Sequence, residues 1–168
     1  MNTKRIDSIL DSVLPNQANF LGVFARDMIP FLNQNSQLCF VANTDPSSKK
    51  GTHWVSFYQE PFGIEFFDSY GFEPSAYGFN VPPNVQINNS CFQSIDSDVC
   101  GQYCIYYLTH RNKGYTLSEI NDSFTPNSPI INDNTVAHYV SKLTKRLDPS
   151  TRHCITCNQA CTKQCEFK

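Results

Sequence analysis

The segment from residue 99 to residue 112 constrains the fold more than any other part of the chain. Its apolar residues are Val99, Tyr103, Ile105, Tyr106, Tyr107 and Leu108. Because these residues fall on most faces of a helix, we expect a buried helix that packs against a β-sheet. Cys100 and Gly101 stand at the start of this helix, next to backbone N–H groups that have no intrahelical partner.

Three segments that precede this helix can form the sheet. Residues 37–43, 52–59 and 63–68 are rich in β-branched and aromatic side chains and are predicted to be extended. The last two form a predicted hairpin that turns across residues 60–63. The other non-helical segments are a predicted turn over residues 20–24, an irregular loop over 72–84 that could wall a cleft, and a short strand near 85–88.

The spacing of apolar residues predicts three further helices, over residues 3–14, 116–124 and 134–147. Pro15 stops the first, and Asp148 and Pro149 end the last. The predicted fold class is therefore α+β, with a small mixed sheet packed against a buried central helix and additional helices around it.

The size and charge of the chain limit its organisation. A length of 168 residues favours one domain, which we place at residues 1–150, followed by a cysteine-rich C-terminal tail at 151–168 that packs on the domain or extends from it. The net charge of -2 and pI near 6.0 give no overall attraction to nucleic acid. A small basic patch could still form from Lys142, Lys145, Arg146 and Arg152.

The N-terminus and the cysteines indicate where the protein acts. Asp7, Ser8 and Asp11 interrupt the first apolar residues, so the start of the chain resembles neither a signal peptide nor a membrane span. We expect a protein that is not secreted and has no membrane partner. Of eight cysteines, four crowd into residues 154–165 and the rest are scattered, a distribution typical of reduced thiols.

Cys100 has the setting of a nucleophilic thiol. A free thiol is mostly protonated at neutral pH, so it needs positive potential from a helix start or a nearby imidazolium. His53 is the candidate imidazole, because it lies in an extended segment that can hold its ring in place. Asp68 lies on the next strand of the predicted hairpin, where its carboxylate could fix the tautomer of His53.

Gln93 precedes Cys100 by seven residues and can donate to a developing oxyanion, with the Cys100 backbone N–H as a second donor. Gly101 would allow substrate to approach the helix start. Each residue alone has a structural alternative: a strand histidine, a small buried cysteine, a turn-forming aspartate or a solvated loop glutamine. The coincidence of four compatible residue types favours a thiol protease, with Cys100 as nucleophile, His53 as base and Asp68 as its orienting group.

Four short motifs resemble the adenovirus-type maturation proteases (adenain) and their relatives in virophages and viral-like transposons. The motifs are the Phe-Leu-Gly-Val-Phe run at 20–24, Gly-Thr-His-Trp at 51–54, Phe-Asp-Ser-Tyr-Gly-Phe at 67–72, and Gln93 with Cys-Gly-Gln-Tyr-Cys at 100–104. The resemblance covers roughly residues 15–112. It implies an adenain-like, papain-like fold, a triad of His53, Asp68 and Cys100, and Gln93 in the oxyanion hole. Gly51, Thr52, Trp54 and Gly101 are the implied substrate-binding residues.

The resemblance also implies a substrate and a place of action. It implies an endopeptidase that cleaves capsid or core precursor proteins after small residues, near glycine, during virion maturation in the host cell. We expect a monomer that needs no cofactor. Adenain is activated by a short peptide and by DNA, so both are candidate partners. Adenain has glutamate where Asp68 stands, whereas proteases of SUMO and other ubiquitin-like modifiers have aspartate, which gives removal of such a modifier as an alternative.

The C-terminal tail offers a different class of function. Cys154, Cys157, Cys161 and Cys165 include a Cys-x-x-Cys half-site, which is typical of zinc ligands. If the tail were one helix, however, the four thiols would span about 16 Å, too far for one metal. The alternatives are a stripe of free cysteines, a metal site that uses fewer of them, or disulfides. We assign no metal, and a zinc-dependent interaction module without catalysis is the second alternative function.

Overall fold

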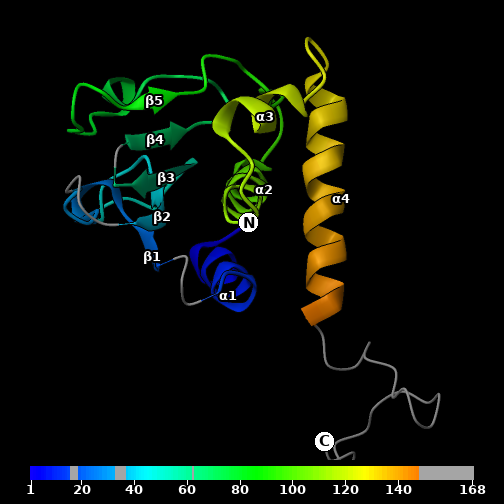
Figure 1. Ribbon diagram of the computed structural model, residues 1–168, viewed down its shortest axis with the longest axis horizontal. Helices are drawn as coiled ribbons and strands as arrows, with labels where there is room; N and C mark the ends of the chain where they lie inside the picture. The colour runs from blue at the N-terminus through cyan, green and yellow to red at the C-terminus, as the bar shows by residue number, and fades with distance from the viewer. Residues whose placement is uncertain (16–18, 33–36, 62, 148–168) are drawn as a thin grey trace, which may run out of the picture.

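Five strands form one mixed sheet in the computed structural model, which describes residues 1–15, 19–32, 37–61 and 63–147. The strands are β1 (Phe20–Phe24), β2 (Leu38–Asn43), β3 (Trp54–Glu60), β4 (Gly63–Phe67) and β5 (Gln86–Ile87). They lie in the order β1-β2-β3-β4-β5 (Figure 1). The two central pairings, β2 with β3 and β3 with β4, are antiparallel, and the two outer pairings are parallel.

The predicted hairpin is confirmed as the pair β3 and β4. Glu60 pairs with Gly63 at its turn, and Ser56 pairs with Phe67 near its open end. His53 directly precedes β3 and Asp68 directly follows β4. Because the two strands are antiparallel, both residues lie at the same end of the hairpin.

Helices cover one face of the sheet (Figure 1). They are α1 (Thr3–Val13), α2 (Cys100–Arg111), α3 (Leu117–Asp122) and α4 (Pro129–Leu147), and two short 3-10 helices lie at Arg26–Met28 (η2) and Pro74–Tyr77 (η3). α2 contacts β3 directly, with α1 and α4 packed against it. The buried central helix predicted from its apolar faces is confirmed, and Cys100 is its first residue.

The sheet is buried on both faces, which explains its long apolar runs. All residues of β2 are buried. Cys39 and Val41 point toward the helices. Leu38, Phe40 and Ala42 point to the opposite face, where Phe57 and Phe79 pack. Successive strand residues face opposite ways, so each face obtains its own core. The loop that contains η3 covers this second face.

Two elements differ from the sequence prediction. The turn predicted over residues 20–24 is wrong: this segment is β1, which pairs parallel with β2 and has a register shift between Phe20 and Val23. Gly22 takes a φ of +114° at this irregularity, so the glycine marks a bulge and not a turn. α4 begins at Pro129, five residues before the predicted start, and proline is favoured at the first position of a helix.

Candidate active site

His53 and Asp68 contact each other at the end of the sheet where β3 begins and β4 ends. His53 Nε2 lies 2.6 Å from Asp68 Oδ1, and the Asp68 side chain is fully buried. Because Nε2 is engaged by the carboxylate, Nδ1 is the ring nitrogen left to face another group. The structure thus brings together the two residues that the hairpin predicted as neighbours.

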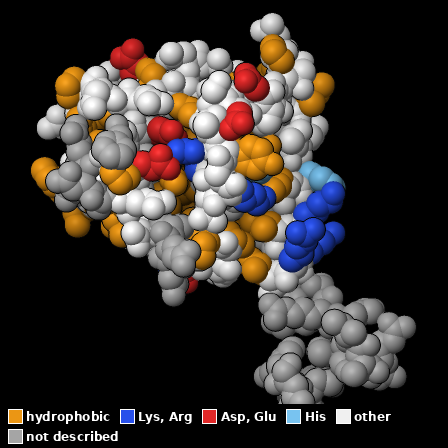
Figure 2. Space-filling model, viewed as in Figure 1, with side chains coloured by type: hydrophobic (Ala, Val, Ile, Leu, Met, Phe, Trp, Pro, Cys, Tyr) orange, Lys and Arg blue, Asp and Glu red, His pale blue; other side chains and the backbone are white. Residues whose placement is uncertain are grey.

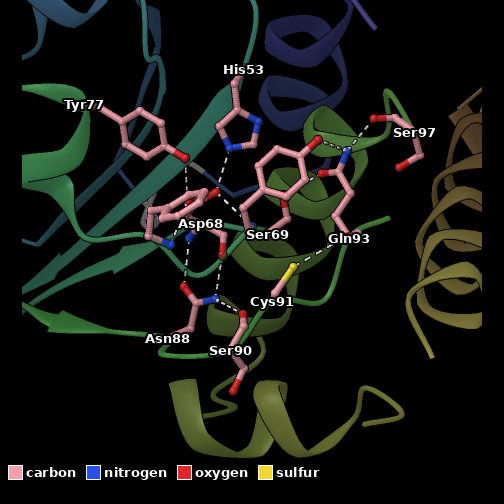
Figure 3. A network of polar contacts seen from close by, with 11 residues as sticks. His53, Asp68, Ser69, Tyr77, Asn88, Ser90, Cys91, Gln93 and Ser97 are labelled. Carbon is pink, nitrogen blue, oxygen red and sulfur yellow. Dashed lines mark hydrogen bonds and ion pairs between the residues drawn. The ribbon is translucent and has the colours of Figure 1, made fainter. Parts of the chain in front are cut away.

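Three donors hold the Asp68 carboxylate besides the imidazole (Figure 3). Oδ1 accepts from the Tyr70 backbone N–H at 3.1 Å, and Oδ2 accepts from the Phe72 backbone N–H at 3.0 Å and the Tyr77 hydroxyl at 2.8 Å. A buried carboxylate without such partners would be costly. These bonds fix the carboxylate in one orientation toward His53.

The Cys100 thiol lies beside the imidazole of His53. Interactions with the His53 side chain and with the backbone N–H groups of Trp54 and Gly101 favour the ionised thiol and lower the pKa of Cys100. Burial raises the pKa of Cys100, but these interactions outweigh burial and leave the pKa below its ordinary value. Burial lowers the pKa of His53, whereas Asp68 and Cys100 raise it more strongly, to about 9. Both directions favour a thiolate paired with an imidazolium.

Two other buried thiols are in a different chemical state. Burial raises the pKa of Cys39 to about 12, and it raises the pKa of Cys104 well above its ordinary value. Cys104 lies one helical turn from Cys100, so the helix alone does not activate a thiol. The contact with His53 distinguishes Cys100 from its buried neighbours.

The Gln93 side chain is only 2% exposed and is fixed at both ends. Its Oε1 accepts from the Ser69 hydroxyl at 2.6 Å, and its Nε2 donates to the Ser97 carbonyl at 2.8 Å and to the Tyr70 hydroxyl at 3.3 Å. Figure 3 shows the Gln93 amide beside Ser97, with the dashed line of their hydrogen bond. The alternative of a solvated loop glutamine is therefore wrong. The amide is buried and held in one orientation, and both of its N–H groups are directed at protein oxygens.

A cleft of about 610 Å³ opens beside Cys100. Gly51, Thr52 and Trp54, the suggested substrate-binding residues, all line it. Gly51 has a φ of +67°, and a Cβ there would lie 2.5 Å from the Asn43 side-chain nitrogen. Only glycine fits this position, because both the backbone conformation and the available space exclude a side chain.

Gly101 has a different role from the one predicted for it. It does not line the cleft but is buried, and a Cβ at this position would lie 2.9 Å from Ile6 Cδ1. The glycine allows α1 to pack closely on the start of α2. Of these two glycines, only Gly51 lines the cleft.

A basic surface lies at the opposite end of α2 from Cys100. Lysine and arginine side chains gather over the C-terminal part of α4 (Figure 2), which carries Lys142, Lys145 and Arg146. A hollow of about 230 Å³ there is lined by Lys113, Lys142 and Arg146 among others. Arg152, the fourth member of the predicted patch, lies outside the described residues.

The described part of the chain holds no cluster of three or more metal-ligating side chains. The four tail cysteines, Cys154, Cys157, Cys161 and Cys165, lie outside the described residues. Among the helices described, none combines the length and apolarity needed to cross a membrane.

Sequence reasoning did not find four residues of this network: Ser69, Tyr70, Tyr77 and Asn88. The Asn88 side chain accepts from the Asp68 backbone N–H at 2.8 Å and donates to its carbonyl at 2.6 Å. Ser69 and Tyr70 follow Asp68 directly, so their position at the strand end was a usable signal. Nothing in the sequence linked Asn88 or Tyr77 to Asp68, because these two residues lie on separate later segments of the chain.

Comparisons with known proteins show similarity to viral proteases. The family model described as adenovirus endoprotease matches residues 20–80, which include His53 and Asp68. The protease of Bovine adenovirus 4 is 26% identical over 140 residues, which covers 66% of this chain and 70% of that protein. The protease of Bovine adenovirus C serotype 10 is 29% identical over 109 residues, with shares of 53% and 56%. The crystal structure of the selenomethionine ASFV protease has a TM-score of 0.41 at 21% identity, over 61% of this chain and 43% of that one.

A reactive thiol beside an imidazole, on a mixed sheet packed against helices, is the arrangement of a cysteine protease, and this chain is an enzyme of that class. Its relatives within the class are the viral proteases of the adenovirus type. Proteases of this class act on polypeptides, so the substrate is a polypeptide chain.

Proposed function

We propose that this chain is a viral endopeptidase that cleaves capsid or core precursor proteins at glycine-containing sites during virion maturation. In this proposal Cys100 is the nucleophile, His53 is general base and then general acid, Asp68 orients His53, and Gln93 stabilises the oxyanion. The catalytic unit is the single domain over residues 1–150. The proposed place of action is the virion and the interior of the host cell.

The observation that carries the proposal is the mutual influence of Cys100, which lines the cleft, and His53. The thiol is the first residue of α2, its pKa is lowered, and the imidazole beside it is bound to a buried carboxylate at 2.6 Å. A structural cysteine would have the raised pKa of Cys39 or Cys104. The lowered pKa therefore indicates a thiol prepared for nucleophilic attack.

The first half of the proposed reaction transfers the acyl group to sulfur. Cys100 Sγ attacks the scissile carbonyl carbon, an S–C bond forms, and the carbonyl π electron pair moves to oxygen. The oxyanion receives a hydrogen bond from the Cys100 backbone N–H, and the Gln93 side chain contributes to its stabilisation. The C=O bond then re-forms, the C–N bond breaks, and the leaving amine takes a proton from the His53 imidazolium.

The second half releases the acid product. Neutral His53 takes a proton from water while the water oxygen attacks the thioester carbon. Collapse of this second oxyanion breaks the S–C bond and returns the thiolate beside a protonated His53. Asp68 holds the imidazole ring in one orientation and stabilises the imidazolium that forms in each cycle.

The proposal includes partners that remain to be tested. An activating peptide is carried over from the family resemblance. DNA is supported as a second candidate by the basic surface over Lys113, Lys142 and Arg146, which could contact phosphates. We propose a monomeric enzyme. Adding a candidate peptide or DNA to purified enzyme, and measuring the change in turnover, tests each partner separately.

One observation favours a second candidate function. The orienting carboxylate is Asp68, the residue type found in proteases that remove SUMO and other ubiquitin-like modifiers. Such an enzyme would use the same Cys100 chemistry but would cut after the C-terminal glycines of a folded modifier. The two candidates differ in substrate and not in mechanism.

Incubation with capsid precursors and with SUMO fusions, followed by mass spectrometry of the products, tests both candidates. We expect internal cuts in the capsid precursors at glycine-containing sites. Cuts confined to the modifier junction would instead support modifier removal.

The same assay tests the mechanism. Cys100→Ala should abolish all cleavage, and His53→Ala should do the same, with the fold intact by circular dichroism. Cys39→Ala is the matched control, because it removes a buried thiol remote from the cleft and should leave turnover unchanged. Wild-type turnover in Cys100→Ala would refute the mechanism.

A further inference from the structure

Tyr70 contacts both Gln93 and His53 in the candidate site. It accepts a hydrogen bond from Gln93 Nε2 at 3.3 Å. The Tyr70 ring lies against the His53 ring, with centroids 4.7 Å apart and planes tilted by 31°. The side chain is half-buried. The motif at 67–72 contains this tyrosine, but the proposed triad assigns no role to it.

The Gln93 amide has no proton free for a direct contact with an oxyanion. One Nε2 proton is used by the Ser97 carbonyl at 2.8 Å, and the other points to the Tyr70 hydroxyl. The Ser69 hydroxyl fixes Oε1 at 2.6 Å, so the amide cannot rotate without loss of a buried hydrogen bond. A substrate oxygen near Gln93 therefore meets the Tyr70 hydroxyl first.

The Tyr70 hydroxyl keeps its own proton available. It accepts from Gln93, and within the described residues no acceptor is found for the proton that it carries. Burial raises the pKa of Tyr70, and the nearby negative charges of Cys100 and Asp68 raise it further. The hydroxyl is therefore a donor throughout the pH range in which the thiolate pair exists.

We propose that Tyr70 is an oxyanion donor that acts in series with Gln93. Gln93 Nε2–H donates to the Tyr70 oxygen, and the Tyr70 O–H donates to the oxygen that becomes negative when Cys100 attacks. Donation from Gln93 polarises the hydroxyl and strengthens its bond to the oxyanion, as in other hydrogen-bond chains. The proton stays on Tyr70, and no bond to it is made or broken. This inference depends on the proposed peptidase mechanism.

Removal of the hydroxyl alone provides the test. Tyr70→Phe keeps the ring against His53 and deletes only the donor. Loss of one oxyanion donor costs about 10²–10³-fold in turnover in enzymes of this kind, so we expect kcat to fall by about that factor with KM nearly unchanged. Tyr115→Phe, which removes a hydroxyl from a half-exposed ring distant from the cleft, is the matched control.

Two reagents separate an oxyanion donor from a structural tyrosine. A peptide aldehyde forms a tetrahedral adduct with Cys100 that resembles the intermediate, so its affinity should fall with kcat in Tyr70→Phe. Iodoacetamide needs the thiolate but forms no oxyanion, so the alkylation rate of Cys100 should stay at its wild-type value. Peptide mapping by mass spectrometry reports Cys100 and the exposed thiol of Cys91 in the same sample, and Cys91 serves as the internal reference.

A double variant tests the order of the two donors. If Tyr70 and Gln93 act in series, Tyr70→Phe with Gln93→Ala should lose no more activity than the more severe single variant. Multiplied losses would overturn the serial arrangement. Wild-type kcat in Tyr70→Phe, or slower Cys100 alkylation in equal proportion, would overturn the donor role. Persistent cleavage by Cys100→Ala would instead refute the peptidase mechanism itself, so the two failures are distinguishable.

Discussion

Replacement of Asp68 by asparagine should move the alkaline limb of activity. The carboxylate hydrogen bonds to His53 Nε2 at 2.6 Å and helps to raise the pKa of His53 from 6.5 to about 9, against the opposing effect of burial. A raised pKa means that the imidazolium persists as pH rises and is lost as pH passes about 9. Asparagine removes the charge and can turn an N–H toward Nε2, so the pKa of His53 should fall to its ordinary value or below.

The size of the effect follows from the two pKa values. At pH 8 a group with a pKa of about 9 is roughly 90% protonated, whereas a group at 6.5 is about 3% protonated, a difference of roughly thirty-fold. At pH 6 both forms are mostly protonated, and the same effect is less than about twofold. The deficit of Asp68→Asn should therefore grow about twenty-fold between pH 6 and pH 8, in addition to a constant loss from poorer ring orientation.

The assay is kcat/KM for a peptide substrate from pH 5 to pH 10, because this ratio reports the ionisations of the free enzyme. The alkylation rate of Cys100 over the same range gives a second profile that does not depend on substrate. Asp122→Asn, the same chemical change at an exposed position of α3, is the control and should reproduce the wild-type profile. An alkaline limb near pH 9 in Asp68→Asn would refute the role of this carboxylate in holding the imidazolium.

Two further predictions concern the residues around Asp68. Tyr77→Phe removes a hydrogen-bond donor from the Asp68 carboxylate, which becomes a stronger acceptor for His53. We expect kcat to fall only about fivefold. The alkaline limb of the pH profile should move to higher pH, opposite to its shift in Asp68→Asn. A downward shift would contradict this reasoning. Gly71→Ala places a Cβ 2.7 Å from the Ser90 backbone at a φ of +74°, so the free energy of unfolding should drop by about 2–4 kcal/mol in urea titrations. An unchanged urea midpoint would show that this turn adapts to a side chain.

The sequence predicted those parts of the fold that depend on local pattern. The apolar faces of α2 and the paired runs of β3 and β4 appear where the periodicity placed them, and the hairpin brings His53 next to Asp68. β1 was missed because Gly22 interrupts its pattern, and a bulge cannot be distinguished from a turn without the strand that it pairs with. The start of α4 was missed because its first residues include exposed Ile130 and Ile131, which give no amphipathic signal.

The supporting residues of the site were beyond local pattern for a different reason. Asn88 binds the backbone of Asp68 across twenty residues of chain, and Tyr77 reaches the same carboxylate from η3. Such contacts depend on the path of irregular loops near the end of β4, and loop sequences have no periodic pattern that predicts this path. The role of Gly101 was misassigned because a glycine needed for helix packing and one needed for substrate access are identical in sequence.

One short segment, residues 68–71, connects all parts of the site, and this has a consequence for its energetics. Asp68 hydrogen bonds to His53, and the Ser69 hydroxyl donates to the side-chain oxygen Oε1 of Gln93. Tyr70 contacts both His53 and Gln93. Gly71 permits the turn that packs this segment against Ser90. A shift of the segment therefore displaces the imidazole and the oxyanion donors together. Losses from substitutions within it should be less than additive, because the first displacement already disrupts the partners of the second. Gly51 lies in the cleft against Asn43, which is not a partner of this segment, so substitutions at Gly51 should add independently.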